Sequence, residues 1–200
     1  MAEDNAIFES VDGSIYNYLR NRIIKYPQGK TDEDFILPSG VMYVNNYAFY
    51  ENQYLKSIDI SNVYSIGRYA FSECASLQYI KAGNLLNFID AYAFYKCKYL
   101  DSFSTGGELF SIGNFAFSEC PNLRELVFEG KIGEIGWSAF KNNNKLQSVV
   151  FGSTVDKLST NLLEGCINLR FFAVPNGVKT INKYLAYSKE KYKWKKLLLL

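Results

Sequence analysis

The chain of 200 residues contains no histidine, and it has only 4 cysteines and 4 prolines. The absence of histidine excludes Ser-His-Asp triads, histidine-ligated metal centres and the side chain that most often senses pH near neutrality. No stretch reaches the roughly 20 apolar residues that a membrane-spanning helix needs. The sequence therefore directs attention away from catalysis and toward binding.

Charge of either sign is also modest. The 22 Lys and Arg residues nearly balance the 20 Asp and Glu residues, which leaves a formal net charge of +2. This is too little to indicate a nucleic acid or an acidic membrane as partner. The first ten residues, MAEDNAIFES, are acidic and lack the apolar core of a secretory signal peptide. With 48% hydrophobic and 21% charged residues, the composition is that of a folded chain.

Aromatic residues are abundant, with 16 Tyr and 15 Phe, and their placement is periodic. One apolar column recurs after 22 residues and then four times after 23: Phe49, Phe71, Phe94, Phe117, Phe140 and Leu163. Each step brings the same neighbours, as in IGRYAFSECASLQYIKA and IGNFAFSECPNLRELVF. Such a period predicts a solenoid in which every repeat forms one coil.

Two parts of the repeat predict its secondary structure. The pattern L-x-x-I-x-A, as at Leu77, Ile80 and Ala82, predicts a short strand that pairs in parallel between repeats. In I-G-x-Y-A-F, the residue after Ile is Gly, Asn, Asp or Ser, which are preferred helix N-caps, so a short helical turn is expected there. We therefore expect an α/β repeat fold: a curved, right-handed solenoid with a parallel sheet on its concave face and short helical turns on its convex face.

Both ends of the array are degenerate. We expect a single domain over 1–200, with six repeats in 44–174 and an N-terminal cap or degenerate repeat in 11–43. The cap should hold short strands at 14–18 and 22–26 and a further strand in the segment FILP. Residues 175–200 are expected to form a C-terminal half-repeat and a capping helix. The alternative for the tail KEKYKWKKLLLL is a membrane-surface helix, but its lysines alternate with a period of two, which does not produce an amphipathic helix.

A column of cysteine and asparagine follows each Phe by three residues: Asn52, Cys74, Cys97, Cys120, Asn143 and Cys166. Disulfides or zinc would need convergent side chains, whereas a ladder of inward residues on successive coils does not converge. The asparagines at two of the six positions favour buried free thiols with a turn-satisfying role. No metal and no cofactor are expected.

The unit I-G-x-Y-A-F-x-x-C-x-x-L-x-x-I and the leading segment DGSIYNYLRNRIIKYPQGKTDEDFILPSGV resemble the BspA-like (Treponema pallidum-type) leucine-rich repeat family. The resemblance covers roughly residues 11–187. It implies a leucine-rich repeat solenoid and non-enzymatic adhesion at the cell surface, with a host matrix protein or another cell as partner. Because no secretion signal or anchor is visible in the sequence, a cytoplasmic location is the alternative expectation.

The strand positions that point away from the core form the candidate binding face. They are polar toward the N-terminus and apolar toward the C-terminus, and the alternative is that a terminal element covers the apolar end. The candidate partner-binding residues are Ser57, Asp59, Tyr79, Lys81, Ser102, Ser104, Glu125, Val127, Ser148, Val150, Phe171 and Ala173.

A second aromatic column precedes each Phe by two residues: Tyr47, Tyr69, Tyr92 and Phe115. We interpret it as a structural cover of the outer wall, and the alternative is a strip that stacks on carbohydrate. The leading functional hypothesis is a secreted or surface adhesin that binds a protein. An intracellular scaffold or adaptor and a glycan-binding protein are the alternatives, and no enzyme is expected.

Overall fold

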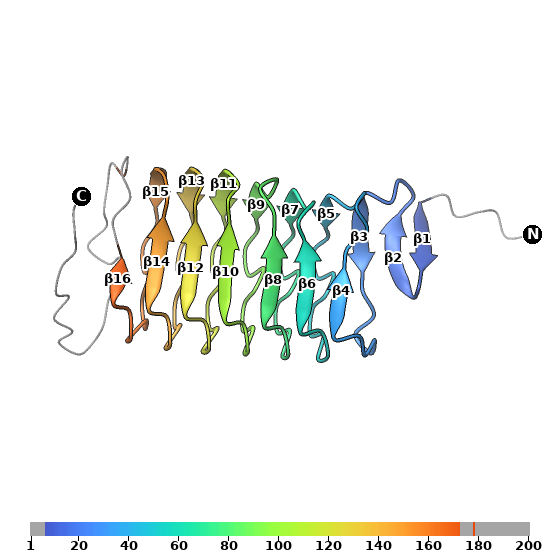
Figure 1. Ribbon diagram of the computed structural model, residues 1–200, viewed down its shortest axis with the longest axis horizontal. Helices are drawn as coiled ribbons and strands as arrows, with labels where there is room; N and C mark the ends of the chain where they lie inside the picture. The colour runs from blue at the N-terminus through green and yellow to red at the C-terminus, as the bar shows by residue number, and fades with distance from the viewer. Residues whose placement is uncertain (1–6, 173–177, 179–200) are drawn as a thin grey trace, which may run out of the picture.

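The computed structural model describes residues 7–172 and residue 178, which form an elongated stack of coils (Figure 1). Each coil contributes one strand to a front row and one to a back row, so the expected parallel solenoid is confirmed. The front strands are β4 (Asp34–Ile36), β6 (Ser57–Ile60), β8 (Tyr79–Ala82), β10 (Ser102–Thr105), β12 (Glu125–Phe128), β14 (Ser148–Phe151) and β16 (Phe171–Phe172). The six from β6 to β16 are the strands predicted from L-x-x-I-x-A.

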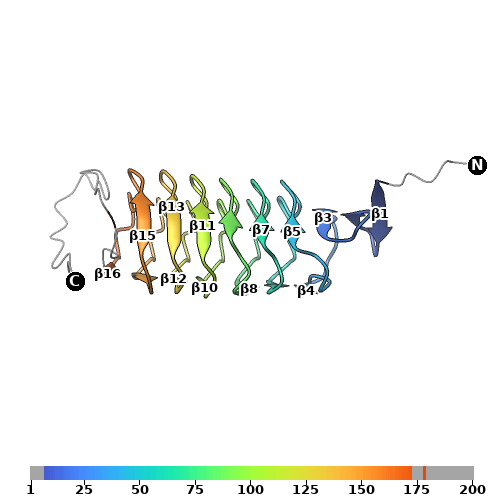
Figure 2. The ribbon, with the colours of Figure 1, turned by 90° about the horizontal axis from the view of Figure 1, so that it is seen from above.

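The back row is one continuous sheet, seen from another side in Figure 2. Its order is β1-β2-β3-β5-β7-β9-β11-β13-β15, antiparallel from β1 to β3 and parallel thereafter. The strands are β1 (Phe8–Val11), β2 (Ser14–Asn17), β3 (Arg22–Lys25), β5 (Tyr43–Val44), β7 (Ser65–Ile66), β9 (Phe88–Ile89), β11 (Leu109–Ile112), β13 (Ile132–Ile135) and β15 (Val155–Leu158). The two cap strands predicted at 14–18 and 22–26 correspond to β2 and β3, and the strand in FILP corresponds to β4.

The prediction of short helical turns was wrong, because residues 7–172 contain no helix. A helix would direct each main-chain N–H to the carbonyl four residues earlier. Instead, the N–H of Phe49 donates to the carbonyl of Ala70 in the next coil (2.7 Å), while that of Ala48 donates to Asn45 within its own turn (3.2 Å). Every second main-chain N–H of the turn therefore donates to the next coil, and this side of the solenoid consists of stacked turns.

This alternation requires left-handed backbone at two residues per coil, with φ close to +58° at both Tyr47 and Glu51. The same two positions recur in every repeat: Tyr69 and Glu73, Tyr92 and Lys96, Phe115 and Glu119, Ser138 and Asn142, Asn161 and Gly165. Gly165 is the only glycine among them. A left-handed conformation costs other residues about 1–2 kcal/mol each, so the contacts between coils must offset a strain that recurs along the array.

The glycine after the repeat isoleucine is required for close packing and does not cap a helix. A Cβ on Gly67 would lie 2.6 Å from Oδ1 and 2.7 Å from N of Asn46 in the preceding coil. Only a residue without a side chain fits there unless the backbone shifts. At Gly67 the expectation of an N-cap is thus replaced by a steric requirement, which does not extend to the coils that carry Asn45, Asp90 or Ser159 at this position.

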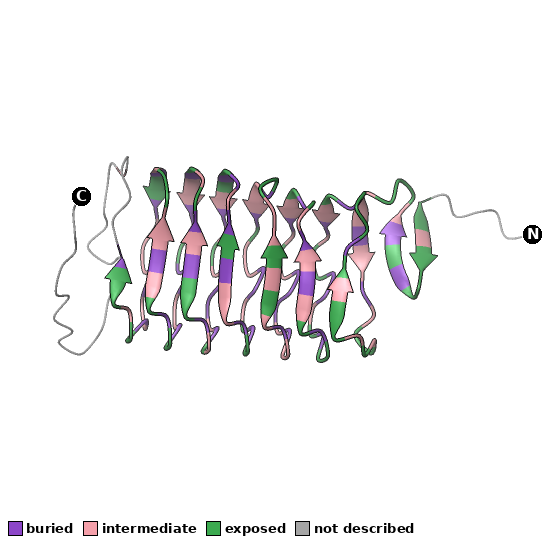
Figure 3. Ribbon diagram, viewed as in Figure 1, coloured by how far each residue is buried: buried purple, intermediate pink, exposed green. Residues whose placement is uncertain are grey.

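The core lies between the two rows and contains the repeated phenylalanines as a stack of rings. Phe49, Phe71, Phe94 and Phe117 are fully buried, and their successive ring centroids are 4.8, 5.2 and 4.9 Å apart. Inward strand residues fill the rest, so most front strands show buried residues between partly exposed ones (Figure 3). The inward positions of the predicted repeat are confirmed for most coils.

The front row is divided between β8 and β10. It consists of a three-stranded sheet, β4-β6-β8, and a four-stranded sheet, β10-β12-β14-β16. Ile80 and Ala82 of β8 are only partly buried, unlike their counterparts Ile58 and Ile60 in β6. The back sheet runs past this division without interruption. The predicted half-repeat and capping helix in 175–200 lie outside the described residues.

Candidate functional site

The outward columns of the front row lie in the register that the repeat predicted. Ser57 is opposite Tyr79 and Asp59 is opposite Lys81 in the first sheet. In the second sheet the columns are Ser102, Glu125, Ser148 and Phe171, and then Ser104, Val127 and Val150. The division between β8 and β10 separates the two groups, so the candidate residues form two neighbouring surfaces. Ala173 lies outside the described residues.

The surface on the first sheet is polar and self-paired. Nζ of Lys81 lies 2.7 Å from Oδ2 of Asp59, and the hydroxyl of Ser57 donates to the carboxylate of Asp34. The hydrogen bond from Lys81, assisted by hydrogen bonds from Ser61, lowers the pKa of Asp59 to about 2. Tyr79 stands beside this pair with 59% of its surface exposed. These side chains already satisfy one another, which leaves little unbalanced charge for a ligand.

The surface on the second sheet becomes apolar toward β16. The hydroxyl of Ser148 donates to Oε1 of Glu125 at 2.9 Å. Beyond that pair, Val127 and Val150 are partly exposed, and Phe171 is 45% exposed. We call Val127, Val150 and Phe171 the front apolar patch. An apolar group bordered by Ser104, Glu125 and Ser148 has the composition of a protein-binding surface.

The cysteine column is part of the scaffold. All four thiols are free and buried, and Sγ of Cys74 and of Cys120 donate to the carbonyls of Phe49 and Phe94, each at 3.1 Å. Asn143 replaces cysteine in one coil, and its Nδ2 donates to the carbonyl of Phe117 at 2.8 Å. Burial raises the pKa of the Cys74 thiol to about 12. The turn-satisfying role is confirmed, and these protonated thiols are poor nucleophiles.

The tyrosine column forms a continuous stack on the turns. Ring centroids are 5.0 Å apart from Tyr47 to Tyr69, 4.7 Å from Tyr69 to Tyr92 and 4.9 Å from Tyr92 to Phe115, with interplanar angles of 11–14°. The ring faces are occupied by the neighbouring rings. Stacking on a sugar needs a free face, so this geometry favours the structural interpretation of the column.

Sequence analysis missed a second aromatic surface, on the outer side of the back sheet. Tyr43, Tyr64, Phe88 and Phe110 contact in series, with centroids 6.1, 5.6 and 5.3 Å apart. We call these four the back aromatic strip. They occupy two outward positions between buried apolar residues in VMYV, VYSI, LNFI and LFSI. That spacing could have revealed a strand with two adjacent outward residues, had the segment not been assigned to a helical wall.

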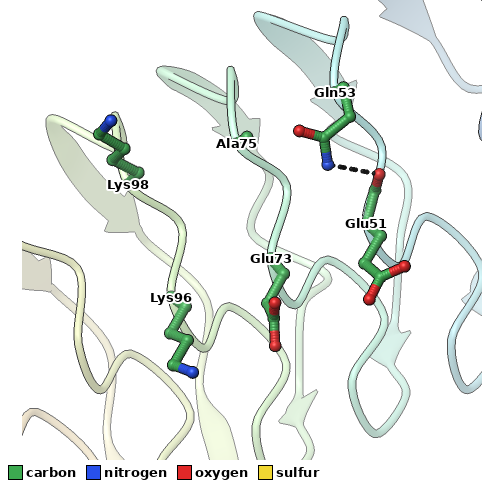
Figure 4. A pocket seen from close by; sticks show the side chains of 6 residues that line it. All are labelled: Glu51, Gln53, Glu73, Ala75, Lys96 and Lys98. Carbon is green, nitrogen blue, oxygen red and sulfur yellow. Dashed lines mark hydrogen bonds between the residues drawn. The ribbon is translucent and has the colours of Figure 1, made fainter.

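A shallow hollow of about 410 Å³ lies on the turn edge of the solenoid (Figure 4). It is lined by Glu51, Gln53, Glu73, Ala75, Lys96 and Lys98. Within the described part of the chain, none of its four charged side chains forms an ion pair. Hydrogen bonding to Glu51 raises the pKa of Tyr50, beside the hollow, to about 12. The hollow is open, charged and without a nucleophile.

Residues 7–172 carry few other groups that could support chemistry. No group of three metal-binding side chains occurs there, and no helix there is long and apolar enough to cross a membrane. The clustered carboxylates near the first repeat serve ion pairs: Asp32 with Lys30 (3.1 Å) and Glu33 with Lys56 (2.6 Å). These carboxylates are exposed structural partners.

The family profile of the BspA-type leucine-rich repeat region matches residues 28–144 and 64–193. Together these matches span most of the repeat array. The chain belongs to the BspA-type leucine-rich repeat family. The resemblance seen in the sequence is thus confirmed, whereas no curated protein sequence matches the chain.

Solved structures give the same fold. A leucine-rich repeat protein from Eubacterium ventriosum is 22% identical with a TM-score of 0.78, over 96% of this chain and 53% of that one. The pneumococcal vaccine antigen PcpA is 25% identical with a TM-score of 0.63, over 88% and 42%. The Treponema pallidum leucine-rich repeat protein is 21% identical with a TM-score of 0.57, over 84% and 91%. The chain spans about half the length of the first two.

Proposed function

We propose that this chain is a non-enzymatic protein-binding module, secreted or displayed at the cell surface, that binds its partner through the front apolar patch. The observation that carries the proposal is the exposure of Phe171 on β16, diagonal to Val150 on β14, which in turn is opposite Val127 on β12. Burying a large aromatic side chain and two valines, with hydroxyl and carboxylate groups at the rim, is how protein interfaces concentrate their binding energy.

Three further observations support this proposal. The thiols are protonated and buried, and the carboxylates are paired or exposed. The hollow on the turn edge holds no nucleophile. The described residues therefore offer surfaces for binding and few groups for catalysis. Membership of a repeat family agrees with a scaffold for recognition. A surface location draws support from the similarity to a vaccine antigen, PcpA.

The test compares capture by three forms of the purified chain on extracellular matrix proteins and on intact cells, with mass spectrometry of what is retained. Val150→Asp combined with Phe171→Asp places two carboxylates in the patch and should abolish capture. Asn144→Asp combined with Ile167→Asp adds the same charges to exposed turns of the same two coils, and this control should bind like the wild type. All three should show the same thermal melt.

Two results would remove the proposal. Undiminished capture by the folded patch variant would show that the front apolar patch is not the site. Hits on a glycan array together with no retained protein would support the glycan-binding alternative. Separately, protease treatment of intact source cells should degrade the chain if it is displayed, and full protection would favour the intracellular adaptor.

A further inference from the structure

The back aromatic strip has the features of a second contact surface. Phe110 is 67% exposed, which is more than the front-face aromatics Tyr79 and Phe171, and Tyr64 is 36% exposed. Gly133 follows Phe110 in the next coil of its column, so the position directly opposite Phe110 carries no side chain. Isolated surface aromatics are common, but four in mutual contact across β5, β7, β9 and β11 make a contiguous apolar surface.

Cationic charge marks one end of the strip. The guanidinium of Arg22 lies over the ring of Tyr43, with Cζ 4.6 Å from the centroid. No carboxylate among residues 7–172 forms an ion pair with Arg22, whereas six other cations pair with a carboxylate of a neighbouring coil. A guanidinium beside an aromatic ring keeps N–H groups that can bind a carboxylate with two hydrogen bonds.

The end of the strip near Phe110 has more negative than positive charge around it. Beyond Phe110, Lys157 pairs with Glu134 (2.7 Å) and Lys131 pairs with Asp156 (2.9 Å). Asp156 and, more weakly, Glu108 raise the pKa of Lys131. Three carboxylates, those of Glu108, Glu134 and Asp156, therefore lie near two lysines at this end. A ligand that crosses the strip therefore contacts the unpaired Arg22 at one end, the aromatic rings in the middle and ion-paired side chains at the other end.

We propose that the back aromatic strip binds a short polypeptide segment whose apolar side chains pack on Tyr64, Phe88 and Phe110 and whose carboxylate pairs with Arg22. From β3 to β11 the surface spans four inter-strand steps, or roughly 19 Å, which an extended segment of about six residues covers. Protein interfaces are enriched in Tyr, Phe and Arg. Because Arg22 lies at one end of the strip, its charge fixes which end of the bound segment is acidic.

This surface is separate from the front apolar patch, so the two can be tested independently. A library of random peptides displayed on phage is selected on the full chain, and the best binder is measured by fluorescence anisotropy. Selected peptides should carry Asp or Glu at one end of an aromatic or aliphatic run. Phe110→Asp should weaken binding at least about tenfold, as expected for a central interface residue.

Two matched variants complete the design. Arg22→Gln should weaken binding several-fold and reduce its dependence on salt, since it deletes the unpaired cation at the end of the strip. The front pair Val150→Asp and Phe171→Asp should leave the peptide affinity unchanged. Thermal melts verify folding, and Phe110→Ser provides the same test if the Asp variant is unstable.

Three results would overturn the inference: selected peptides without acidic residues, binding that survives Phe110→Asp, and binding that follows the front variants instead. Retention on heparin that Arg22→Gln abolishes, in the absence of any selected peptide, would identify an anionic glycan and reject a polypeptide occupant.

Discussion

The thiol of Cys97 donates a hydrogen bond to the main-chain carbonyl of Phe71 in the preceding coil, with Sγ and O 3.1 Å apart. This carbonyl also accepts from the N–H of Cys74 in its own turn at 3.2 Å, so the thiol adds a second bond that joins it to the neighbouring coil. It recurs wherever the column holds cysteine, and the amide of Asn143 makes the equivalent contact to Phe117. A column conspicuous in the sequence therefore serves the stacking of coils.

Removing this donor should destabilise the array. Cys97→Val keeps a small apolar side chain but leaves the carbonyl of Phe71 with only the N–H of Cys74, at a cost of about 0.5–1.5 kcal/mol in the free energy of unfolding. Cys97→Asn should lose less, because asparagine supplies the same donor in another coil. Urea unfolding followed by circular dichroism gives both values. Equal losses for the two variants would mean that the hydrogen bond contributes little.

Alkaline pH should weaken the fold through the same thiols. Burial holds the pKa of Cys74 and Cys166 near 12, whereas an unfolded thiol ionises near 8.5. The raised native pKa means that this stabilisation is complete below about pH 8.5 and is lost as the pH rises toward 12. Urea midpoints at pH 8 and pH 10.5 should differ less for Cys97→Asn than for the wild type. Iodoacetamide should label the native protein at pH 8 only as fast as it unfolds.

The phenylalanine stack should contribute far more than the exposed strip. Phe94→Ala removes a fully buried ring and should cost about 3–5 kcal/mol. Phe110→Ala removes a ring that is 67% exposed and should cost less than about 1 kcal/mol. Thermal and urea unfolding of the two variants provide the comparison. A similar loss in both would contradict the assignment of the core.

Glycine at a left-handed turn position should increase the stability of the protein. Glu119 adopts φ +59°, so Glu119→Gly should raise the free energy of unfolding by about 0.5–1 kcal/mol by relieving strain. Glu125→Gly, within strand β12, is the matched control and should lower it by a similar amount. If both substitutions destabilise the protein equally, the strain at position 119 is negligible.

The sequence was sufficient for the coil register and the front strands because a period of 22–23 residues fixes which side chains stack. For the opposite wall, the sequence led to the wrong prediction of helical turns. Gly67 and its equivalents resemble helix caps, yet the glycine is there because the preceding coil approaches within 2.6 Å of where its Cβ would lie. That error also hid the back aromatic strip, since Tyr64 and Phe88 were assigned to no surface. The division between β8 and β10 depends on hydrogen bonds between coils, which no residue pattern revealed.

The front apolar patch is the central functional claim, and amide hydrogen exchange with and without the captured partner tests it most directly. Binding there predicts slower exchange in Glu125–Phe128 and Ser148–Phe151, with Ile132–Ile135 and Val155–Leu158 of the back sheet unchanged. Protection confined to the back strands or to the turn edge, with β12 and β14 unaffected, would contradict it.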